Sequence, residues 1–192
     1  MTRVLVINGH PDSESFCAAL AAAYATGARS AGAEVVSLRI ADLSFNPSLE
    51  HGYRKRTELE PCLLDAWEEI KRADHLVWVF PTWWGGLPAL LKGFIDRVFL
   101  PGFAFKYHGD DLLPEQLLKG KSARLITTMD APGWYYRLVY RSLGTHQLKR
   151  AILNFCGVAP VRTTLFASVK DSSPARRALW LAAVESLGTR RR

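Results

Sequence analysis

Cysteine is scarce in this sequence, and the few cysteines present form no recognisable motif. The three residues, Cys17, Cys62 and Cys156, lie far apart in a chain of 192 residues and include no CxxC pair. An odd and scattered set speaks against a disulfide framework. We therefore expect a reduced protein of the cytoplasm.

Long apolar runs are also missing. No segment has the roughly 20 consecutive apolar residues that a membrane-spanning helix needs. The apolar part of the N-terminal segment MTRVLVINGHP is too short for a signal peptide, and no small-residue cleavage site follows it. The sequence therefore predicts no membrane insertion.

Acidic residues are outnumbered, and the formal net charge is +7. Arg190, Arg191 and Arg192 supply three of these charges at the end of the chain, and the others are scattered. Such a balance could attract anionic substrates, but without a clustered patch it is weak evidence for nucleic acid. We expect no nucleic-acid partner.

The common nucleotide-binding motifs are absent as well. The loop NGHPDSESF, which follows the first apolar run, does not match GxGxxG, so a dinucleotide site of the Rossmann type is not expected. Gly120, Lys121 and Ser122 imitate the end of a P-loop. However, Glu115 stands where that motif requires glycine, and the segment precedes a strand.

In the sequence, short apolar runs alternate with segments whose apolar residues recur at helical spacing. Runs rich in valine, isoleucine and other apolar residues predict five strands, at residues 3–9, 34–40, 75–81, 122–128 and 161–169. Apolar residues at helical spacing predict helices at residues 15–32, 60–73, 87–99, 145–156 and 174–187.

Strands that alternate with helices predict a doubly wound α/β fold, a five-stranded parallel sheet with helices on both faces. With the strand order 2-1-3-4-5, the order reverses between the first and third strands, and ligands bind at the carboxyl ends of these strands. We expect a single domain over residues 1–188, followed by a basic tail at residues 189–192.

The loop after the first strand could hold a phosphate. It offers hydroxyls and backbone amides at the start of a helix, at Ser13, Ser15, Phe16 and Cys17. Backbone donors and the helix dipole favour an anion at such a position. His10 could add a proton or a positive charge. The alternative is that Asp12 or Ser13 simply caps the helix.

The loop after the third strand lies within FPTWWGGLPALLKGFIDRVF, residues 80–99. Trp83 and Trp84 are adjacent, so they cannot both point into one core. Gly85 and Gly86 permit close approach of the backbone to a ligand. A flat heterocycle needs such an approach together with aromatic cover. The alternative is that one tryptophan lies in the core and the other on the surface.

These segments resemble those of the flavodoxin-like NAD(P)H:quinone oxidoreductases, the DT-diaphorase type. GHPDSESF is similar to that family's first loop, and FPTWWGGLPALLKGFIDRVF followed by GFAFKY is similar to its most specific signature. ADLSFNP, ITT and FCG also fit. The resemblance extends over almost the whole chain, which carries more weight than a single motif.

The resemblance implies a bound flavin, with FMN favoured and FAD left open. Carried over onto this sequence, the cofactor-binding residues would be His10, Ser15, Phe16, Cys17, Pro81, Thr82, Trp83, Trp84, Gly85, Thr127 and Thr128. Tyr135 and Trp84 would act in catalysis, with backbone amides of residues 129–133 assisting Tyr135.

The resemblance further implies a reaction and an assembly. NADPH or NADH would pass a hydride to the flavin, and a quinone-like acceptor would then take it from the same place, which is a ping-pong mechanism. The family works as a homodimer in which the partner chain completes each site. The segment at residues 102–111 is our candidate for reaching such an interface, and a purely local loop is the alternative.

Some residues depart from the family pattern. Cys17 stands where asparagine is common, MDAPG replaces a glycine-rich loop, and no histidine follows Tyr135 within ten residues. Two other functions stay open from the sequence. A one-electron flavodoxin-like carrier fits poorly with a net charge of +7, because such carriers are commonly acidic. A flavin-binding regulatory subunit docked on a membrane transporter is the other.

Overall fold

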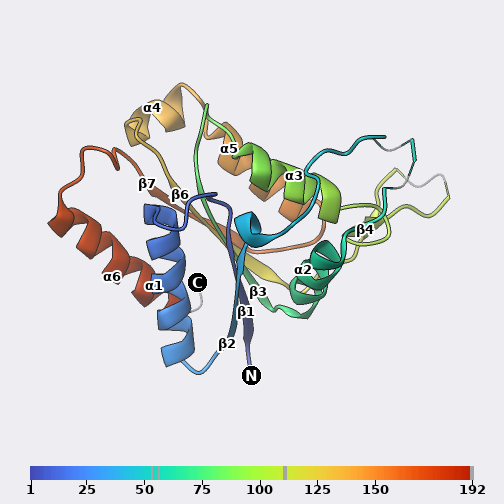
Figure 1. The fold of residues 1–192 in the computed structure, drawn as a ribbon, viewed down its shortest axis with the longest axis horizontal. Helices are drawn as coiled ribbons and strands as arrows, with labels where there is room; N and C mark the ends of the chain where they lie inside the picture. Colours follow the sequence, from blue (N-terminus) through green and yellow to red (C-terminus); the bar gives the residue numbers. More distant parts are fainter. Residues whose placement is uncertain (53, 56, 110–111, 191–192) are drawn as a thin grey trace.

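A five-stranded parallel sheet forms the centre of the protein (Figure 1). The structure is a computed structural model, and it describes residues 1–52, 54–55, 57–109 and 112–190. The strand order of the sheet is β2-β1-β3-β6-β7. Because β6 and β7 are the fourth and fifth predicted strands, this order confirms the expected 2-1-3-4-5 arrangement. The strands are β1 (Arg3–Asn8), β2 (Glu34–Arg39), β3 (His75–Pro81), β6 (Ser122–Thr128) and β7 (Val161–Phe166).

The two central strands β3 and β6 have the predicted bounds, since both are buried apolar runs that end in turn residues. All seven residues of β3 are buried, as expected for a strand covered on both faces. The last strand, β7, ends at Phe166, three residues earlier than predicted. The chain turns there, and the amide of Val169 donates to the carbonyl of Met129 at 3.1 Å.

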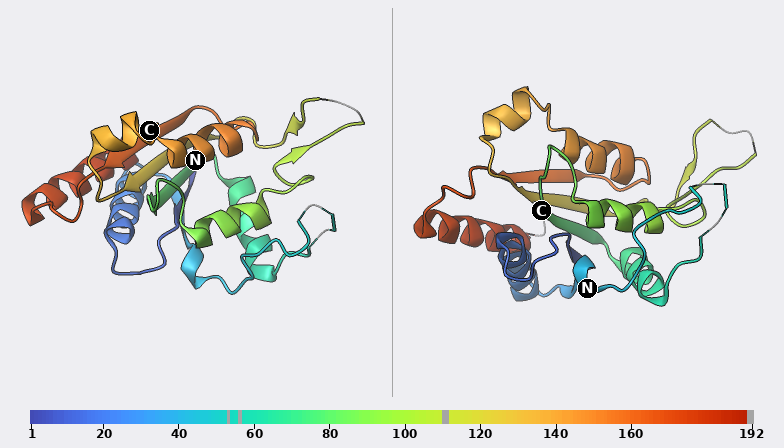
Figure 2. Two further views of the ribbon diagram at one scale, coloured as in Figure 1. Left: turned by 90° about the horizontal axis from the view of Figure 1, so that it is seen from above. Right: turned by 45° about the horizontal axis from the view of Figure 1, so that its top comes forward.

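Helices cover both faces of the sheet and bury a separate apolar cluster on each side (Figure 2). On one face α1 (Phe16–Ser30) and α6 (Pro174–Arg190) lie side by side. On the other face lie α2 (Pro61–Arg72), α3 (Ala89–Val98) and the π-helical segment η2 (Gln147–Asn154). Among the described residues, no helix is both long and apolar enough to cross a bilayer.

The helices α1 and α6 cross at glycines. A side chain on Gly27 would meet the carbonyl of Glu185, and one on Gly188 would meet the carbonyl of Tyr24. The close approach explains why α6 continues to Arg190, three residues beyond its predicted end. The expected basic tail is therefore helical as far as it is described, and its last two residues, Arg191 and Arg192, lie outside the described residues.

Several elements were not predicted. The helix expected at residues 145–156 is instead α5 (Leu143–His146) followed directly by η2, and a further short helix, α4 (Gly133–Leu138), precedes it. A 3₁₀ turn, η1 (Ile40–Asp42), follows β2.

A small antiparallel pair, β4 (Phe105–Lys106) and β5 (Glu115–Gln116), also went unpredicted and extends away from the body of the molecule (Figure 2). The strand β4 lies within the segment at residues 102–111, of which Asp110 and Asp111 lie outside the described residues.

The guanidinium of Arg97 holds the long segment between β2 and α2 against α3. Arg97 is 1% exposed, and its Nη2 donates to Glu60 Oε2 and to the carbonyl of Glu58, both at 2.7 Å. Its Nη1 donates to the carbonyl of Asn46. These bonds satisfy the two terminal nitrogens of the buried charge, whereas its Nε is buried without a hydrogen-bond partner among the described residues.

We expect Arg97→Met to lower the free energy of unfolding by about 3 kcal/mol, because it leaves the Glu60 carboxylate and two carbonyls without their donor. Arg72→Met is the control, since Arg72 is exposed and its ion pair with Glu69 is long at 3.7 Å. That control should cost less than about 1 kcal/mol. Urea unfolding measures both. Equal midpoints for the two variants would show that the Arg97 contacts do not stabilise the fold.

Candidate functional site

Two adjoining cavities lie at the carboxyl ends of the strands, where the strand order reverses between β1 and β3. The first has a volume of about 290 Å³ and is bounded by the loops after β1, β3 and β6. Eight of the predicted cofactor-binding residues line it: His10, Ser15, Phe16, Cys17, Pro81, Thr82, Trp83 and Thr128. The fold thus brings together residues that are more than a hundred positions apart.

The helix α1 begins in this cavity, and Ser15 is its capping residue. The Ser15 hydroxyl accepts from the amide of Ala18 at 3.2 Å and donates to the carbonyl of Asp12 at 2.8 Å. The sequence-based alternative, a cap at Asp12 or Ser13, was therefore wrong about the position. The amides of Phe16 and Cys17 belong to the first turn and have no acceptor within the helix, so they are available to an anion.

His10 is fixed as a neutral donor. Its Nδ1 accepts from the amide of Asp12 at 3.0 Å, so the neutral ring carries its proton on Nε2. Partial burial lowers the pKa of His10, and the nearby Asp12 carboxylate only partly opposes this. The ring meets Trp83 edge to face, with centroids 5.5 Å apart. His10 therefore supplies an N–H at neutral pH rather than the positive charge that the sequence left open.

Cys17 replaces the asparagine of the family pattern without becoming a reactive thiol. It is 1% exposed, and burial raises the pKa of its thiol to about 11. Its sulfur lies 3.2 Å from Thr128 Oγ1, and either atom could donate. A protonated thiol in this position is a weak hydrogen-bonding group at the base of the cavity and not a nucleophile.

The double tryptophan forms a tight turn that sends its two side chains apart. Trp83 and Gly86 exchange two backbone hydrogen bonds, of 3.2 and 2.9 Å. The central residues Trp84 and Gly85 have φ of 51° and 74°, the signs of a type I′ turn. Trp83 lines the cavity and is 45% exposed, whereas Trp84 is fully exposed. Neither side chain is in the core.

Backbone hydrogen bonds attach this turn to its neighbours. The amide of Thr82 donates to the carbonyl of Thr128 at 2.7 Å, and the amide of Gly144 donates to the carbonyl of Gly85 at 2.9 Å. The hydroxyls of Thr82 and Thr127 are 2.8 Å apart. Thr127 is fully buried and does not line the cavity, so it lies behind Thr82 and not beside a ligand.

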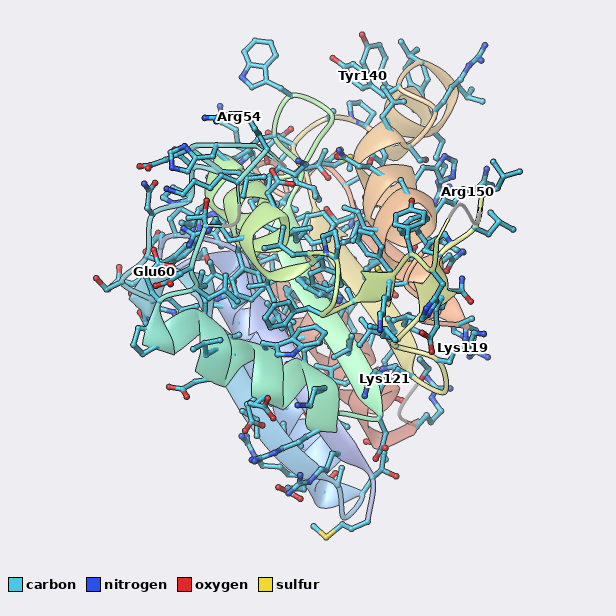
Figure 3. The ribbon with its side chains drawn as sticks, turned by 90° about the vertical axis from the view of Figure 1, so that its right-hand side faces the viewer. Arg54, Glu60, Lys119, Lys121, Tyr140 and Arg150 are labelled. Carbon is cyan, nitrogen blue, oxygen red and sulfur yellow. The ribbon has the colours of Figure 1, made fainter. Side chains whose placement is uncertain are left out.

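The second cavity, of about 320 Å³, shares Thr82, Trp83, Met129 and Asp130 with the first, so the two form one groove. The turn residues Trp84 and Gly85 line it, as do Ala131, Tyr136 and Tyr140. Figure 3 shows Tyr140 at the same end of the molecule as the short helix α4.

Tyr135, the tyrosine predicted to be catalytic, does not line this cavity. Its ring makes edge-to-face contacts with Trp134 and Tyr140 at 5.7 and 5.3 Å between centroids. Tyr136 lines the cavity instead, and its hydroxyl accepts from the amide of Thr145 at 3.1 Å. The sequence analysis missed Tyr136 and Tyr140, although the run of aromatic residues after Gly133 was a signal that could have directed attention to them.

The groove therefore has a polar end and an aromatic end. The polar end offers hydroxyls, an imidazole N–H and the amides of a helix N-terminus, and the aromatic end offers tryptophan and tyrosine rings on a glycine-containing turn. In the parts of the chain that the structure describes, no group of three histidine, cysteine or acidic residues could hold a metal ion. The arrangement suits an elongated ligand with a phosphate at one end and a flat ring at the other.

Proteins with related sequences are oxidoreductases. An uncharacterized NAD(P)H oxidoreductase of Haemophilus influenzae is 32% identical over 171 residues, which cover 86% of this chain and 83% of that protein. NAD(P)H dehydrogenase [quinone] 1 of Rattus norvegicus is 26% identical, over 91% of this chain and 72% of the relative. An FMN-dependent NADH:quinone oxidoreductase 2 of Listeria innocua is 37% identical, over 62% of this chain and 55% of that protein.

A solved structure has the same fold. The crystal structure of Smu.1420 from Streptococcus mutans superposes with a TM-score of 0.86 at 33% identity, over 98% of this chain and 100% of that one. The flavodoxin-like fold family matches residues 2–187. The chain therefore belongs to the flavodoxin-like fold family, and its relatives within that family are NAD(P)H oxidoreductases, as its sequence motifs predicted.

Proposed function

We propose that this protein is an FMN-dependent oxidoreductase that passes a hydride from NAD(P)H, through the flavin, to a quinone or a similar flat acceptor. The observation that carries this proposal is the continuous groove at the switch point, with its polar and aromatic ends joined at Thr82 and Trp83. The names of the relatives, which include NAD(P)H, FMN and quinone, support it.

The polar end of the groove fits the phosphate and sugar-like chain of FMN. The amides of Phe16 and Cys17 would hold the phosphate, and the hydroxyl of Thr128 would bond to a neighbouring oxygen. Ser15 donates its proton to Asp12, so it could only accept from a hydroxyl of the sugar-like chain. His10 would donate from Nε2, the nitrogen that its contact with Asp12 leaves protonated. FMN is preferred over the larger FAD because no segment of the sequence is evidently built to hold an adenosine.

The aromatic end would position the reacting rings. Bound FMN supplies the group that accepts and returns a hydride. The protein contributes the turn at Trp83 and Gly85, against which a flat ring can lie, and a tyrosine wall that limits access of water. Trp84 and Tyr135 remain our predicted catalytic residues, and Tyr140 joins them because it lines the second cavity.

We also propose a homodimer in the cytoplasm. A third cavity, of about 360 Å³, lies between α3, β4 and η2, and apolar side chains such as Phe99, Phe105 and Phe155 line it. A second copy of the chain would cover these side chains, and apolar contact of this kind stabilises obligate dimers. A reducing compartment suits the free cysteines Cys17, Cys62 and Cys156.

We expect the purified protein to be yellow and to carry one FMN per chain, held without a covalent bond. Heat should release the flavin into the supernatant, where chromatography distinguishes FMN from FAD. A colourless protein that takes up neither flavin when it is added would rule out the proposed cofactor.

The kinetics should be ping-pong, since one place in the groove serves donor and acceptor in turn. Double-reciprocal plots of NAD(P)H oxidation at several concentrations of a soluble quinone such as menadione should give parallel lines. Intersecting lines would indicate a ternary complex and contradict the shared site. Oxidation that menadione does not accelerate would favour the carrier or the regulatory subunit over the enzyme.

The two tryptophans should differ in their effects, because Trp83 lines both cavities and Trp84 lines only the second. Trp83→Ala should weaken FMN binding roughly two- to tenfold beyond the effect of lost area, the contribution of one aromatic contact. Trp84→Ala should leave the Kd for FMN nearly unchanged and raise KM for NAD(P)H and quinone. Flavin fluorescence titration and steady-state kinetics measure the two effects, and identical behaviour of both variants would count against this division of the groove.

A further inference from the structure

One long stretch of the chain has no acidic residue. Between Asp130 and Asp171 there is neither aspartate nor glutamate, and the stretch contains six basic residues: Arg137, Arg141, Lys149, Arg150, Arg162 and Lys170. Three of them, Arg137, Lys149 and Arg150, lie in α4 and η2, and Arg141 lies in the turn between α4 and α5. Figure 3 shows Arg150 pointing outward from η2.

The same region exposes large apolar side chains. Trp134, Leu138, Val139 and Leu143 are 62%, 73%, 54% and 61% exposed. Trp134 and Leu138 are one helical turn apart and so share a face of α4. Single exposed apolar residues are ordinary, but four within ten residues form a patch that calls for a partner.

Two arginines lie among these apolar residues. Arg137 and Arg141 are exposed, and neither guanidinium has an ion pair or a hydrogen bond to another described residue. We call the set Trp134, Arg137, Leu138, Val139, Arg141 and Leu143 the α4 surface. In Figures 1 and 2, α4 stands clear of the sheet at the edge where the strands carry their ligand loops.

The backbone fixes the α4 surface next to the groove. Arg141 and Ser142 have φ of 48° and 55°, a pair of left-handed conformations that residues other than glycine rarely adopt. They form a turn closed by the amide of Leu143 and the carbonyl of Tyr140, at 3.1 Å. Because Tyr140 lines the second cavity, this strained turn joins the α4 surface directly to the cavity wall.

We infer that the α4 surface docks the protein on an anionic lipid bilayer. Apolar aromatic and aliphatic side chains would enter the boundary between headgroups and acyl chains, and the arginines would pair with anionic headgroups. A bilayer satisfies both kinds of side chain at once.

A second copy of this chain is a poor partner for the α4 surface. In a two-fold symmetric contact made by this surface alone, Arg137 and Arg141 would meet only the residues of the same surface on the other copy, none of which is acidic. The stretch from residue 131 to 170 offers no carboxylate to pair with them. Nucleic acid would satisfy the arginines but would leave Leu138, Val139 and Leu143 in water.

Docking in this way would bring the mouth of the second cavity to the bilayer, where quinones with long apolar tails reside. The enzyme could then take such a quinone from the membrane, while NAD(P)H enters from water. This consequence rests on the proposed function, but the docking itself does not, so the two can be tested separately.

The test is co-sedimentation of the purified protein with vesicles. It should bind vesicles of phosphatidylcholine mixed with phosphatidylglycerol at about 0.1 M salt, bind pure phosphatidylcholine much more weakly, and release in about 1 M salt. Arg137→Gln combined with Arg141→Gln should weaken binding about thirtyfold, roughly fivefold for each arginine. Trp134→Gln combined with Leu138→Gln should weaken it at least tenfold.

The matched controls are Lys119→Gln and Leu179→Gln, which change an exposed charge and an exposed apolar residue elsewhere and should leave binding unchanged. Figure 3 shows Lys119 at a distance from Tyr140 along the molecule. No binding to the anionic vesicles would overturn the inference. Binding that the Trp134 and Leu138 substitutions do not weaken but that heparin abolishes would also overturn it, because the surface would then be a general site for polyanions.

Turnover with a soluble quinone separates this inference from the proposed function. Trp134→Gln with Leu138→Gln should keep that turnover while it loses vesicle binding and reduction of a long-tailed quinone embedded in the vesicles. Vesicle binding by a protein without any quinone reductase activity would support docking and refute the proposed function. Quinone reduction without vesicle binding would support the proposed function and refute docking.

Discussion

The site depends on backbone hydrogen bonds that fix the turn after β3 to structures on either side of it. The amide of Thr82 continues the ladder between β3 and β6 one step past the strands, and the amide of Gly144 secures the carbonyl of Gly85. These bonds use only main-chain atoms, and glycine at two positions permits them: Gly85 has φ of 74°, and a side chain on Gly144 would meet the carbonyl of Gly85. The turn can therefore present two tryptophans in different directions while its own position stays fixed by the sheet and by α5.

Burial determines the chemistry of the polar groups in the groove. His10 and Cys17 are groups that can ionise near neutral pH, yet partial burial lowers the pKa of the imidazole and burial raises that of the thiol. Both are therefore neutral and act through hydrogen bonds. The electrostatic attraction for an anion is left to the amides at the start of α1, which carry partial charge at any pH.

The sequence was most informative where burial and chemistry agree. The bounds of β3 and β6 followed from their apolar runs, and the two loops beside them could be selected because the strand order identifies the switch point. The sequence was least informative where a tertiary contact decides which way a side chain points. The choice between Tyr135 and Tyr136 as the inward residue depends on one helical step in α4, a helix of six residues without a capping side chain. Likewise, nothing local indicates that Arg97 is buried, since its partners lie about forty and fifty positions away.

The close crossing of α1 and α6 bears on the order in which the chain can acquire its structure during synthesis. Phe16 at the start of α1 packs against Trp180 and Arg177, which are made about 160 residues later. Domains begin to fold from the N-terminus as they leave the ribosome. Here α1 lacks the neighbour on its outer side until α6 has been made, so the packing at the start of α1 is completed only after residues 174–190 have left the ribosome.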